Sequence, residues 1–368
     1  TEIYTLSLHD ALPISAVVVS AFDSRTRMLP FYFATTHLAP AGVRAIGAAL
    51  HDSGLERTRV VMGAWNRRFK PSRASLDGSP IDLLLISSMQ IHLDAGRALI
   101  ADARRMDRSA QPLIVVGGPK AMFEAWHFFD DPAEPHPDVA VTGEEYVLLN
   151  LLEVLLSERG DGEPMREVFD RVRRSGALEA VPGLVYPELD GAGRVEALVD
   201  TGPQRLVGDL DELPDTATGY RLIEAPSWGT TLGREPMSAR GLRFHSPLAS
   251  MVISSGCKFS CPYCPIPAYH QRQQRAKSAG RIAEEFEGLY RQYGPRFVLG
   301  TDDNFFNDHG RAAEIAQTLA RVEIDGRPLR KRIRRGTEVT VHDTLAMREH
   351  LSTDRKSTRL NSSHRIRS

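Results

Sequence analysis

Short apolar runs rich in β-branched residues alternate with helix-length amphipathic stretches from residue 16 onward. The apolar runs predict five strands, at Ala16–Phe22, Arg59–Met62, Ile81–Ser87, Leu113–Val116 and Asp138–Val141. The amphipathic stretches predict helices at Ala41–Asp52, Leu93–Met106, Ala121–Phe128 and Tyr146–Glu158. This alternation is typical of βαβ units, so we predict an α/β domain with a flavodoxin-like (Rossmann-type) parallel sheet over residues 16–158.

The pattern changes between residues 159 and 248. Two apolar stretches, Pro182–Tyr186 and Arg194–Val199, flank an Asp190-Gly191 turn and predict a small hairpin. The Asp209–Pro214 segment and the Pro- and Gly-rich stretch after it predict an extended strap between two domains.

A second α/β pattern covers residues 249–353. Strands are predicted at Ala249–Ser255, Phe297–Gly300 and Thr337–Val341, and helices at Gly280–Tyr293, Gly310–Val322 and Leu345–Leu351. The loops that follow the strands are polar, as they are in barrel enzymes. We therefore predict part of a (βα)6 barrel.

The two ends of the chain differ from the rest. Residues 1–15 (TEIYTLSLHDALPIS) lack an initiator Met, and residues 354–368 (DRKSTRLNSSHRIRS) are polar and without periodicity. Both resemble translated sequencing-adapter read-through, so we expect them to be non-native and the natural protein to be longer.

Composition narrows the class of partners and the compartment. Lys and Arg total 46 against 47 Asp and Glu, a balance that gives no electrostatic reason to expect nucleic acid or an anionic membrane as partner. The basic run Arg327–Arg335 has no interleaved aromatic residue to stack a base. Three cysteines crowded into eight positions do not form a disulfide framework, and no apolar run approaches a membrane span. We expect a cytoplasmic protein.

The cysteines are the strongest chemical signal in the chain. Their spacing, Cys257-x3-Cys261-x2-Cys264, follows a predicted strand, and turns at Gly256 and Pro262 allow three sulfurs to face one centre. Three thiolates are one fewer than a closed iron–sulfur cluster uses, which leaves one metal position open for chemistry. A zinc site completed by His270, or three unrelated buried thiols, are the alternatives.

The segment Gly256–Cys264 resembles the signature of radical S-adenosylmethionine (SAM) enzymes, with Tyr263 at the position that packs near the adenine in that family. The resemblance implies a 4Fe-4S cluster on Cys257, Cys261 and Cys264. It also implies that the open iron chelates SAM, whose reductive cleavage gives a 5′-deoxyadenosyl radical. Such an enzyme needs an electron donor such as flavodoxin or ferredoxin.

Polar residues after the second strand of this domain are candidates for holding SAM. The resemblance implies that Asp302, Asp303 and Asn304 contact its methionyl or ribose part. The alternative is an Asp-rich loop that caps the following helix. Glu338 and His342 are weaker candidates for the mouth of the barrel.

Two loops of the first domain contain small residues suited to a close ligand approach. They are Gly117-Gly118-Pro119 and Thr142-Gly143-Glu144, which by themselves are equally typical of tight βα turns. The order of parts across residues 16–351 resembles the cobalamin-binding subgroup of radical SAM enzymes. That resemblance implies a corrinoid between the two domains, with its nucleotide tail in the sheet.

The chain departs from one pattern of cobalamin proteins. No Asp-x-His-x-x-Gly motif for a lower axial histidine occurs between residues 23 and 40, and neither His37 nor His92 has the flanking residues of that motif. Many radical members of the subgroup lack this motif too, so the resemblance implies cobalamin binding without a histidine ligand. A sheet that has lost cobalamin altogether is the alternative.

The predicted function is cobalamin-dependent methyl transfer to an unactivated carbon by a radical SAM enzyme. A radical cyclase or rearrangement enzyme of the same architecture, and a non-catalytic metal- or corrinoid-binding module, are the alternatives. The substrate, a small molecule or a peptide, is not readable from the sequence.

Overall fold

The structure is a computed structural model that describes residues 14–26, 37–131, 134–215 and 217–337. Its contacts divide the chain into two compact units. The first holds residues up to 36, 42–205 and 218–238, and the second holds 37–41, 206–217 and 239 onward. Glu338, His342, the predicted helix Leu345–Leu351 and the tail 354–368 lie outside the described residues, as do residues 1–13 of the predicted leader.

The first unit is built on a seven-stranded sheet in the order β2-β1-β5-β6-β7-β8-β9. Its five parallel strands are β1 (Ser15–Ser20), β2 (Arg57–Met62), β5 (Leu83–Ser87), β6 (Leu113–Gly117) and β7 (Val139–Val141). Numbered among themselves, these strands follow the order 2-1-3-4-5, which is the flavodoxin-like order predicted from the sequence. Ser15, predicted to belong to the non-native leader, instead begins β1 and pairs with Arg57.

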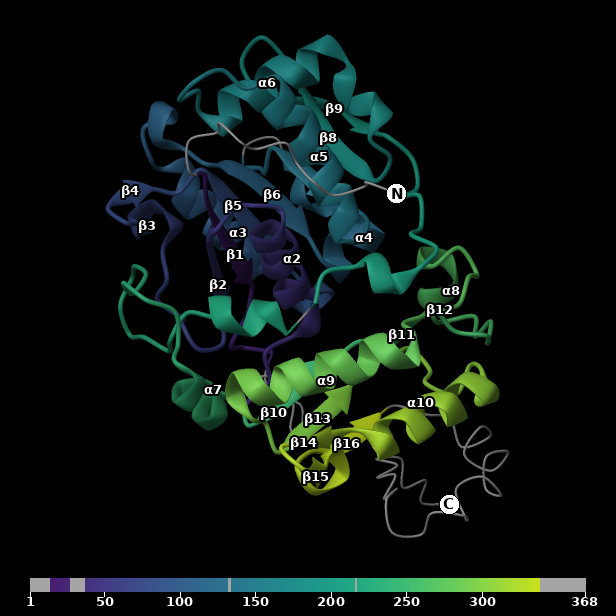
Figure 1. The fold of residues 1–368 in the computed structure, drawn as a ribbon. Coiled ribbons are helices and arrows are strands. Elements are labelled where there is room, and N and C mark those ends of the chain that lie inside the picture. Colours follow the sequence, from purple (N-terminus) through teal and green to yellow (C-terminus); the bar gives the residue numbers. More distant parts are fainter. Residues whose placement is uncertain (1–13, 27–36, 132–133, 216, 338–368) are drawn as a thin grey trace. The chain divides into compact units, whose positions relative to one another are not determined.

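Helices cover both faces of this sheet (Figure 1). They are α2 (Ala41–Asp52), α3 (Leu93–Arg104), α4 (Pro119–Glu124), α5 (Glu145–Ser157) and α6 (Met165–Ser175). Alternation along β1 sends Val17 and Val19 into the core that contains Ile100 of α3. On the other face, α2 comes so close to β2 that a Cβ on Gly47 would lie 2.6 Å from Val60.

The predicted hairpin forms, but it belongs to the sheet rather than to a linker. Its strands, β8 (Leu184–Leu189) and β9 (Val195–Asp200), pair antiparallel, and β8 pairs antiparallel with β7. An edge strand exposes unpaired backbone groups, and the hairpin satisfies those of β7. Helix α6 was not predicted, although its buried Met165, Val168, Phe169 and Val172 follow a helical spacing.

No helix connects β2 to β5. Residues 63–82 instead form a turn of 3-10 helix at Pro71–Arg73 and the short strands β3 (Ser75–Leu76) and β4 (Ser79–Pro80). The edge of β2 is covered by the returning segment 218–238, in which Ile223 forms a parallel bridge with Val60. A buried ion pair of 2.6 Å between Arg59 and Glu224 fixes this contact.

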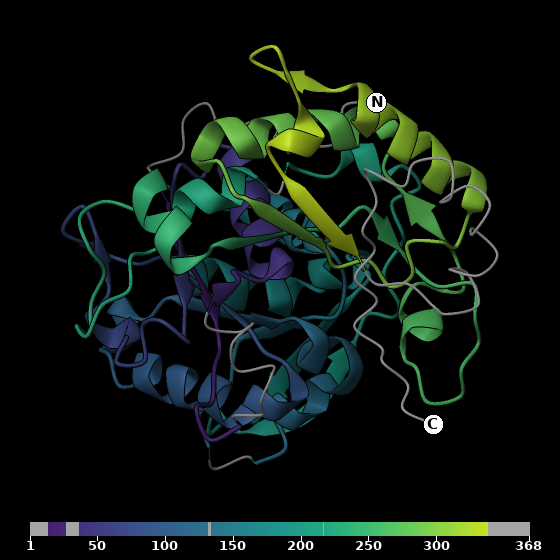
Figure 2. The same cartoon turned by 90° about the horizontal axis from the view of Figure 1, so that it is seen from below.

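The second unit contains three parallel strands in the order β10-β13-β16. They are β10 (Leu248–Met251), β13 (Phe297–Gly300) and β16 (Arg334–Thr337), so the third strand begins three residues before the predicted one. Helices α9 (Ala279–Tyr293) and α10 (His309–Arg321) follow the first two strands and pack on each other (Figure 2). Sequential neighbours in a parallel sheet with helical crossovers are the beginning of a βα barrel.

Short elements complete this unit. Strand β11 (Ser254–Ser255) pairs with β12 (Arg275–Ala276), and β14 (Glu323–Ile324) pairs with β15 (Arg327–Pro328). The helices α7 (Ala239–His245) and α8 (Ile266–Tyr269) precede β10 and follow the cysteines, respectively. Within the described part of the chain, no helix is long and apolar enough to cross a membrane.

Candidate functional site

The cysteine loop belongs to the second unit and begins directly after β11. Its first residue, Gly256, has a φ of +85°, a backbone conformation that residues other than glycine rarely adopt. A Cβ at this position would also collide with the carbonyl oxygen of Gln273, in the segment that leads into β12. The backbone therefore requires glycine immediately before Cys257.

Two side chains from the loop after β13 hold the start of the cysteine loop. The Asp303 carboxylate accepts a 2.7 Å hydrogen bond from the Gly256 amide. The Asn307 amide group donates to the Gly256 carbonyl at 2.6 Å and accepts from the Lys258 amide at 3.0 Å. Residues on both sides of Cys257 are thus fixed to a neighbouring strand end.

Asp302 and Asn304 are buried, each only 2% exposed. One carboxylate oxygen of Asp302 accepts from the amides of Ile253 and Ser254, both at 2.8 Å, where the chain runs from β10 toward the cysteines. Asn304 donates to Asn307 at 3.1 Å. The three polar residues predicted to hold SAM thus contact the backbone and side chains that support the cysteine loop, and their contact with SAM stays a prediction.

The thiols themselves are accessible. Cys261 is exposed, Cys257 and Cys264 are half-buried, and none is in a disulfide. A turn closed by the Cys264 amide and the Cys261 carbonyl, 3.1 Å apart, brings the last two together. Tyr263 is 87% exposed, and the neighbouring charge of Cys261 raises the pKa of its phenol.

The chemistry of three free thiols in one glycine-led loop fits an iron–sulfur cluster. Their present positions do not amount to a formed metal site. Among the residues described, no three His, Cys, Asp or Glu side chains lie close enough together to hold a metal ion. The three cysteines are therefore suitable cluster ligands by their chemistry, and a cluster requires their sulfurs to converge on one centre.

His270 has other partners than the thiols. Its ring is buried, with Nε2 at 3.2 Å from Asp303 and Nδ1 at 3.2 Å from the guanidinium of Arg275. A histidine with both ring nitrogens in contact with these groups would have to reorient to complete a zinc site. This geometry favours the cluster interpretation of the cysteines over the zinc alternative.

In the first unit, the predicted corrinoid loops lie at the carboxyl end of the sheet. Gly118 has a φ of +80°, and a Cβ there would lie 2.5 Å from the Ser87 hydroxyl. At Gly117 the nearest atom to such a Cβ is 3.8 Å away. Gly118 is thus required by packing against the loop after β5, whereas Gly117 leaves room beside the backbone.

The second predicted loop is occupied from within the unit. The side chain of Gln204 accepts from the Glu144 amide at 2.8 Å and from the Tyr146 hydroxyl at 2.9 Å. A Cβ on Gly143 would lie 2.5 Å from Val147, and the Thr142 amide donates to the Gly183 carbonyl at 2.8 Å. The Glu144 amide at the start of α5 is therefore already paired with Gln204.

His92 is buried and serves the loop after β1. Its Nδ1 accepts a 3.1 Å hydrogen bond from the Asp23 amide, and its ring lies 5.1 Å from that of Phe22. Burial lowers the pKa of His92, so the ring is neutral near pH 7. The exclusion of His92 as an axial ligand stays a prediction from the missing motif.

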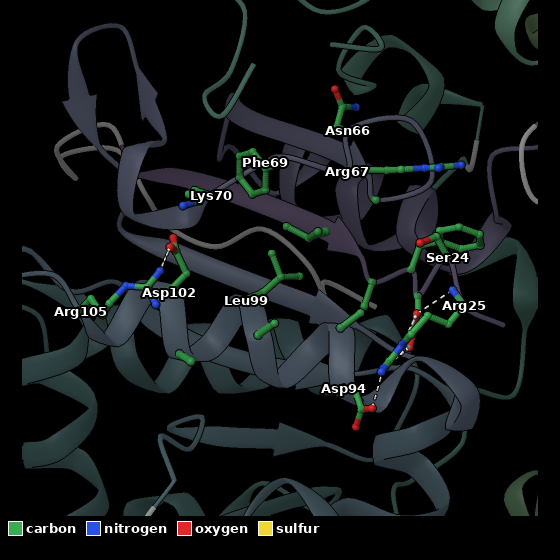
Figure 3. A pocket seen from close by; sticks show the side chains of 18 residues that line it. Ser24, Arg25, Asn66, Arg67, Phe69, Lys70, Asp94, Leu99, Asp102 and Arg105 are labelled. Carbon is green, nitrogen blue, oxygen red and sulfur yellow. Dashed lines mark hydrogen bonds and ion pairs between the residues drawn. The ribbon is translucent and has the colours of Figure 1, made fainter. Parts of the chain in front are cut away.

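A cavity of about 620 Å³ lies in the first unit between β1, the loop after β2 and α3. Figure 3 shows Leu99 and Phe69 in its middle, with the Arg25–Asp94 pair at one end and the Asp102–Arg105 pair at the other. These charges neutralise each other, and the cavity contains none of the predicted site residues. The candidate site is therefore at the strand ends described above.

Comparison with solved structures places the fold. The chain is similar to the cobalamin-dependent SAM radical enzyme OxsB, with a TM-score of 0.56 and 14% identity, over 88% of this chain and 38% of that one. It is also similar to TsrM from Kitasatospora setae, a radical SAM methyltransferase solved with cobalamin and a [4Fe-4S] cluster, with a TM-score of 0.55 and 17% identity. The predicted fold class and the resemblance behind it are confirmed as a likeness of fold.

Two relatives found by sequence comparison are also named methyltransferases. The chain is 27% identical over 168 residues to an uncharacterized methyltransferase of Pyrococcus horikoshii, covering 45% of this chain and 32% of the relative. It is 29% identical over 154 residues to an uncharacterized methyltransferase of Synechocystis sp., covering 40% and 28%. The chain thus spans about a third of the length of these relatives, and it spans 54% of TsrM. The sequence matches no protein-family profile.

Sequence analysis missed three groups that shape the site. Asn307 and Arg275 support the cysteine loop from positions with no recognisable motif, and Gln204 reaches the start of α5 from 60 residues away. The only available signal was polarity near a strand end, which Asn307 shares with its predicted neighbours.

Proposed function

We propose that this protein is a cobalamin-dependent radical SAM methyltransferase that transfers a methyl group to an unactivated carbon. The observation that carries the proposal is the cysteine loop, which follows β11, is fixed by Asp303 and Asn307 from the loop after β13, and occurs in the same chain as a flavodoxin-like sheet. The names of both sequence relatives and of TsrM favour methyl transfer over cyclisation or rearrangement.

The second unit would bind the cluster, and the first unit would bind the corrinoid. Cys257, Cys261 and Cys264 would hold a 4Fe-4S cluster with one open iron. The space beside Gly117 would admit the nucleotide tail of a corrinoid next to the sheet. When bound, the cluster supplies the electron that cleaves SAM, and the corrinoid supplies a methyl group.

The chain's own groups perform the positioning. The rigid backbone at Gly256 and Lys258 would keep the cysteine sulfurs from spreading apart as the loop closes on a metal. Exposed Tyr263 would pack on the adenine of SAM, as the resemblance implies. An electron donor of the flavodoxin or ferredoxin type, a small-molecule or peptide substrate and a cytoplasmic location complete the proposal.

Anaerobic reconstitution tests the proposal. The full chain is loaded with iron and sulfide, then incubated with SAM, a reductant and hydroxocobalamin. We expect a brown protein that contains iron and sulfide, retains corrinoid through gel filtration and produces 5′-deoxyadenosine.

The matched control is a chain with Cys257, Cys261 and Cys264 all changed to Ala, which should keep the corrinoid but lose the cluster and the 5′-deoxyadenosine. Cluster formation without any retained corrinoid would contradict the cobalamin part of the proposal. Bound zinc with no cluster would contradict the radical part.

A further inference from the structure

A continuous chain of polar contacts runs within the second unit from Val207 to Gly256, the first residue of the cysteine loop. It begins at the carbonyl of Val207, two residues after the chain leaves the sheet unit, which accepts from Arg275 at 2.7 Å. Arg275 lies 3.2 Å from Nδ1 of His270, and Nε2 of His270 lies 3.2 Å from the Asp303 carboxylate. The same carboxylate accepts from the Gly256 amide at 2.7 Å.

The donors and acceptors in this chain have a fixed order. Arg275 can only donate, so Nδ1 of His270 accepts from it, and the N–H of the ring is left on Nε2, which faces the Asp303 carboxylate at 3.2 Å. The same Asp303 oxygen accepts the hydrogen bond from the Gly256 amide. Each group thus has one orientation that satisfies its neighbours.

Burial strengthens these contacts. Arg275 is 7% exposed and His270 6% exposed, so water competes weakly for their hydrogen bonds. Arg275 also belongs to β12 and pairs with Ser255, the residue before Gly256. The loop start is therefore held through its own strand and through the side-chain chain.

We propose that His270 is a positioning residue for the cysteine loop: bridging Arg275 and Asp303, it locks the Gly256 turn and thereby the place of Cys257. The role concerns the protein's own loop and exists before any metal is bound. It rests on the proposed function only in the meaning given to the cysteines.

The rate at which Cys257 is alkylated in the metal-free, reduced full chain tests this role, because the rate reports how often the loop opens. His270→Leu removes the contacts with both Arg275 and Asp303, whereas His270→Gln offers an amide that can accept from Arg275 and donate to Asp303. We expect His270→Leu to raise the alkylation rate of Cys257 by about tenfold, which corresponds to ~1.4 kcal/mol in the local opening of the loop. His270→Gln should restore a rate near that of the parent chain.

Arg311→Ala is the matched control. Arg311 also supports the β11–β12 hairpin, by donating to the Ala276 carbonyl at 2.7 Å, but it is outside the chain of contacts. It should leave the Cys257 rate unchanged. If His270→Leu does not fold, Arg275→Gln breaks the same chain one step earlier and takes its place.

Three results would overturn the proposal. They are an unchanged Cys257 rate in the folded His270→Leu chain, an equal rise in Arg311→Ala, or failure of His270→Gln to restore the parent rate. In the reconstituted chain, His270→Leu should also change the electron paramagnetic resonance line shape of the reduced cluster, and His270→Gln should not. A chain that takes up no cluster would refute the proposed function, while the alkylation rates would still decide the role of His270.

Discussion

The loops that follow the first strand of each unit are held by different kinds of contact. After β1, Asp23 and Arg25 pair at 2.6 Å and Arg25 reaches Asp94 at 2.8 Å, all near the surface. Asp23 also accepts from the amide of Arg25, two residues along the same loop. After β10, by contrast, the carboxylates of Asp302 and Asp303 accept hydrogen bonds from backbone amides of a segment 47 to 49 residues away. Exposed ion pairs contribute little to stability. A carboxylate that accepts hydrogen bonds from buried backbone amides contributes more, because those amides would otherwise be left without a partner.

Each loop also has a buried histidine, with a different task. His92 accepts from a single amide and is neutral because burial lowers its pKa. His270 connects a cation to an anion and so transmits position from one segment to another. The comparison indicates that these polar side chains of the second unit fix the backbone that leads into Cys257.

The largest effect is expected at the cysteines. Changing any one of Cys257, Cys261 or Cys264 to Ala leaves two thiolates, too few for an open 4Fe-4S cluster. Iron content after anaerobic reconstitution and 5′-deoxyadenosine formation should both fall to background. A single variant that retains full iron and activity would remove that cysteine from the ligand set.

The next effect concerns Asp302. Replacing it by Ala leaves the buried amides of Ile253 and Ser254 without their acceptor, and we expect the second unit to lose about 3 kcal/mol of unfolding free energy. Urea unfolding measures the change. Asp308→Ala, which removes an exposed cap of α10, is the control and should cost only about 1 kcal/mol. Equal losses in the two variants would contradict the comparison.

A smaller effect is expected in the first unit. Gly118→Ala introduces a side chain at positive φ and places its Cβ against Ser87, so we expect a loss of about 2 kcal/mol. Gly117→Ala should stay within about 0.5 kcal/mol because its Cβ meets no atom closer than 3.8 Å. Thermal unfolding of the two variants compares them directly, and a larger loss at Gly117 would reverse the assignment of their roles.

The smallest effect is the pH dependence due to His92. Because its pKa is lowered in the folded state, the unfolded chain binds a proton more readily below the ordinary value of 6.5. The stability of the first unit should therefore be complete above that pH and fall as pH drops below it. His92→Asn, which keeps an acceptor but does not titrate, should lose less than the parent between pH 7.5 and 5.5, by under about 1 kcal/mol. Parallel pH profiles for both chains would contradict this account.

Local patterns predicted much of the fold. Helix α2 and strand β13 have the predicted bounds, and the order of the five parallel strands follows from the βαβ alternation. The hairpin was recognised by its turn, but its pairing with β7 was not, because sheet membership depends on contacts distant in the sequence. Helix α6 was missed although its apolar spacing and the glycine at its end were readable.

The site was predictable in its ligands and not in its supports. Cysteine spacing is a local signal, so the candidate ligands could be named from the sequence. The bridge from Arg275 through His270 to Asp303 joins residues up to 33 positions apart by side-chain contacts, which leave no periodic trace. Asp302 and Asp303 were recognised as important for a different reason from the one that the geometry gives them.

Electron paramagnetic resonance of the reduced, reconstituted chain before and after addition of SAM tests the central claim most directly. An open iron on the three-cysteine loop predicts the signal of a 4Fe-4S cluster whose line shape changes when SAM is added, and no signal in the chain with all three cysteines changed to Ala. A cluster signal that SAM leaves unaltered, or a chain that binds zinc and gives no signal, would contradict the account.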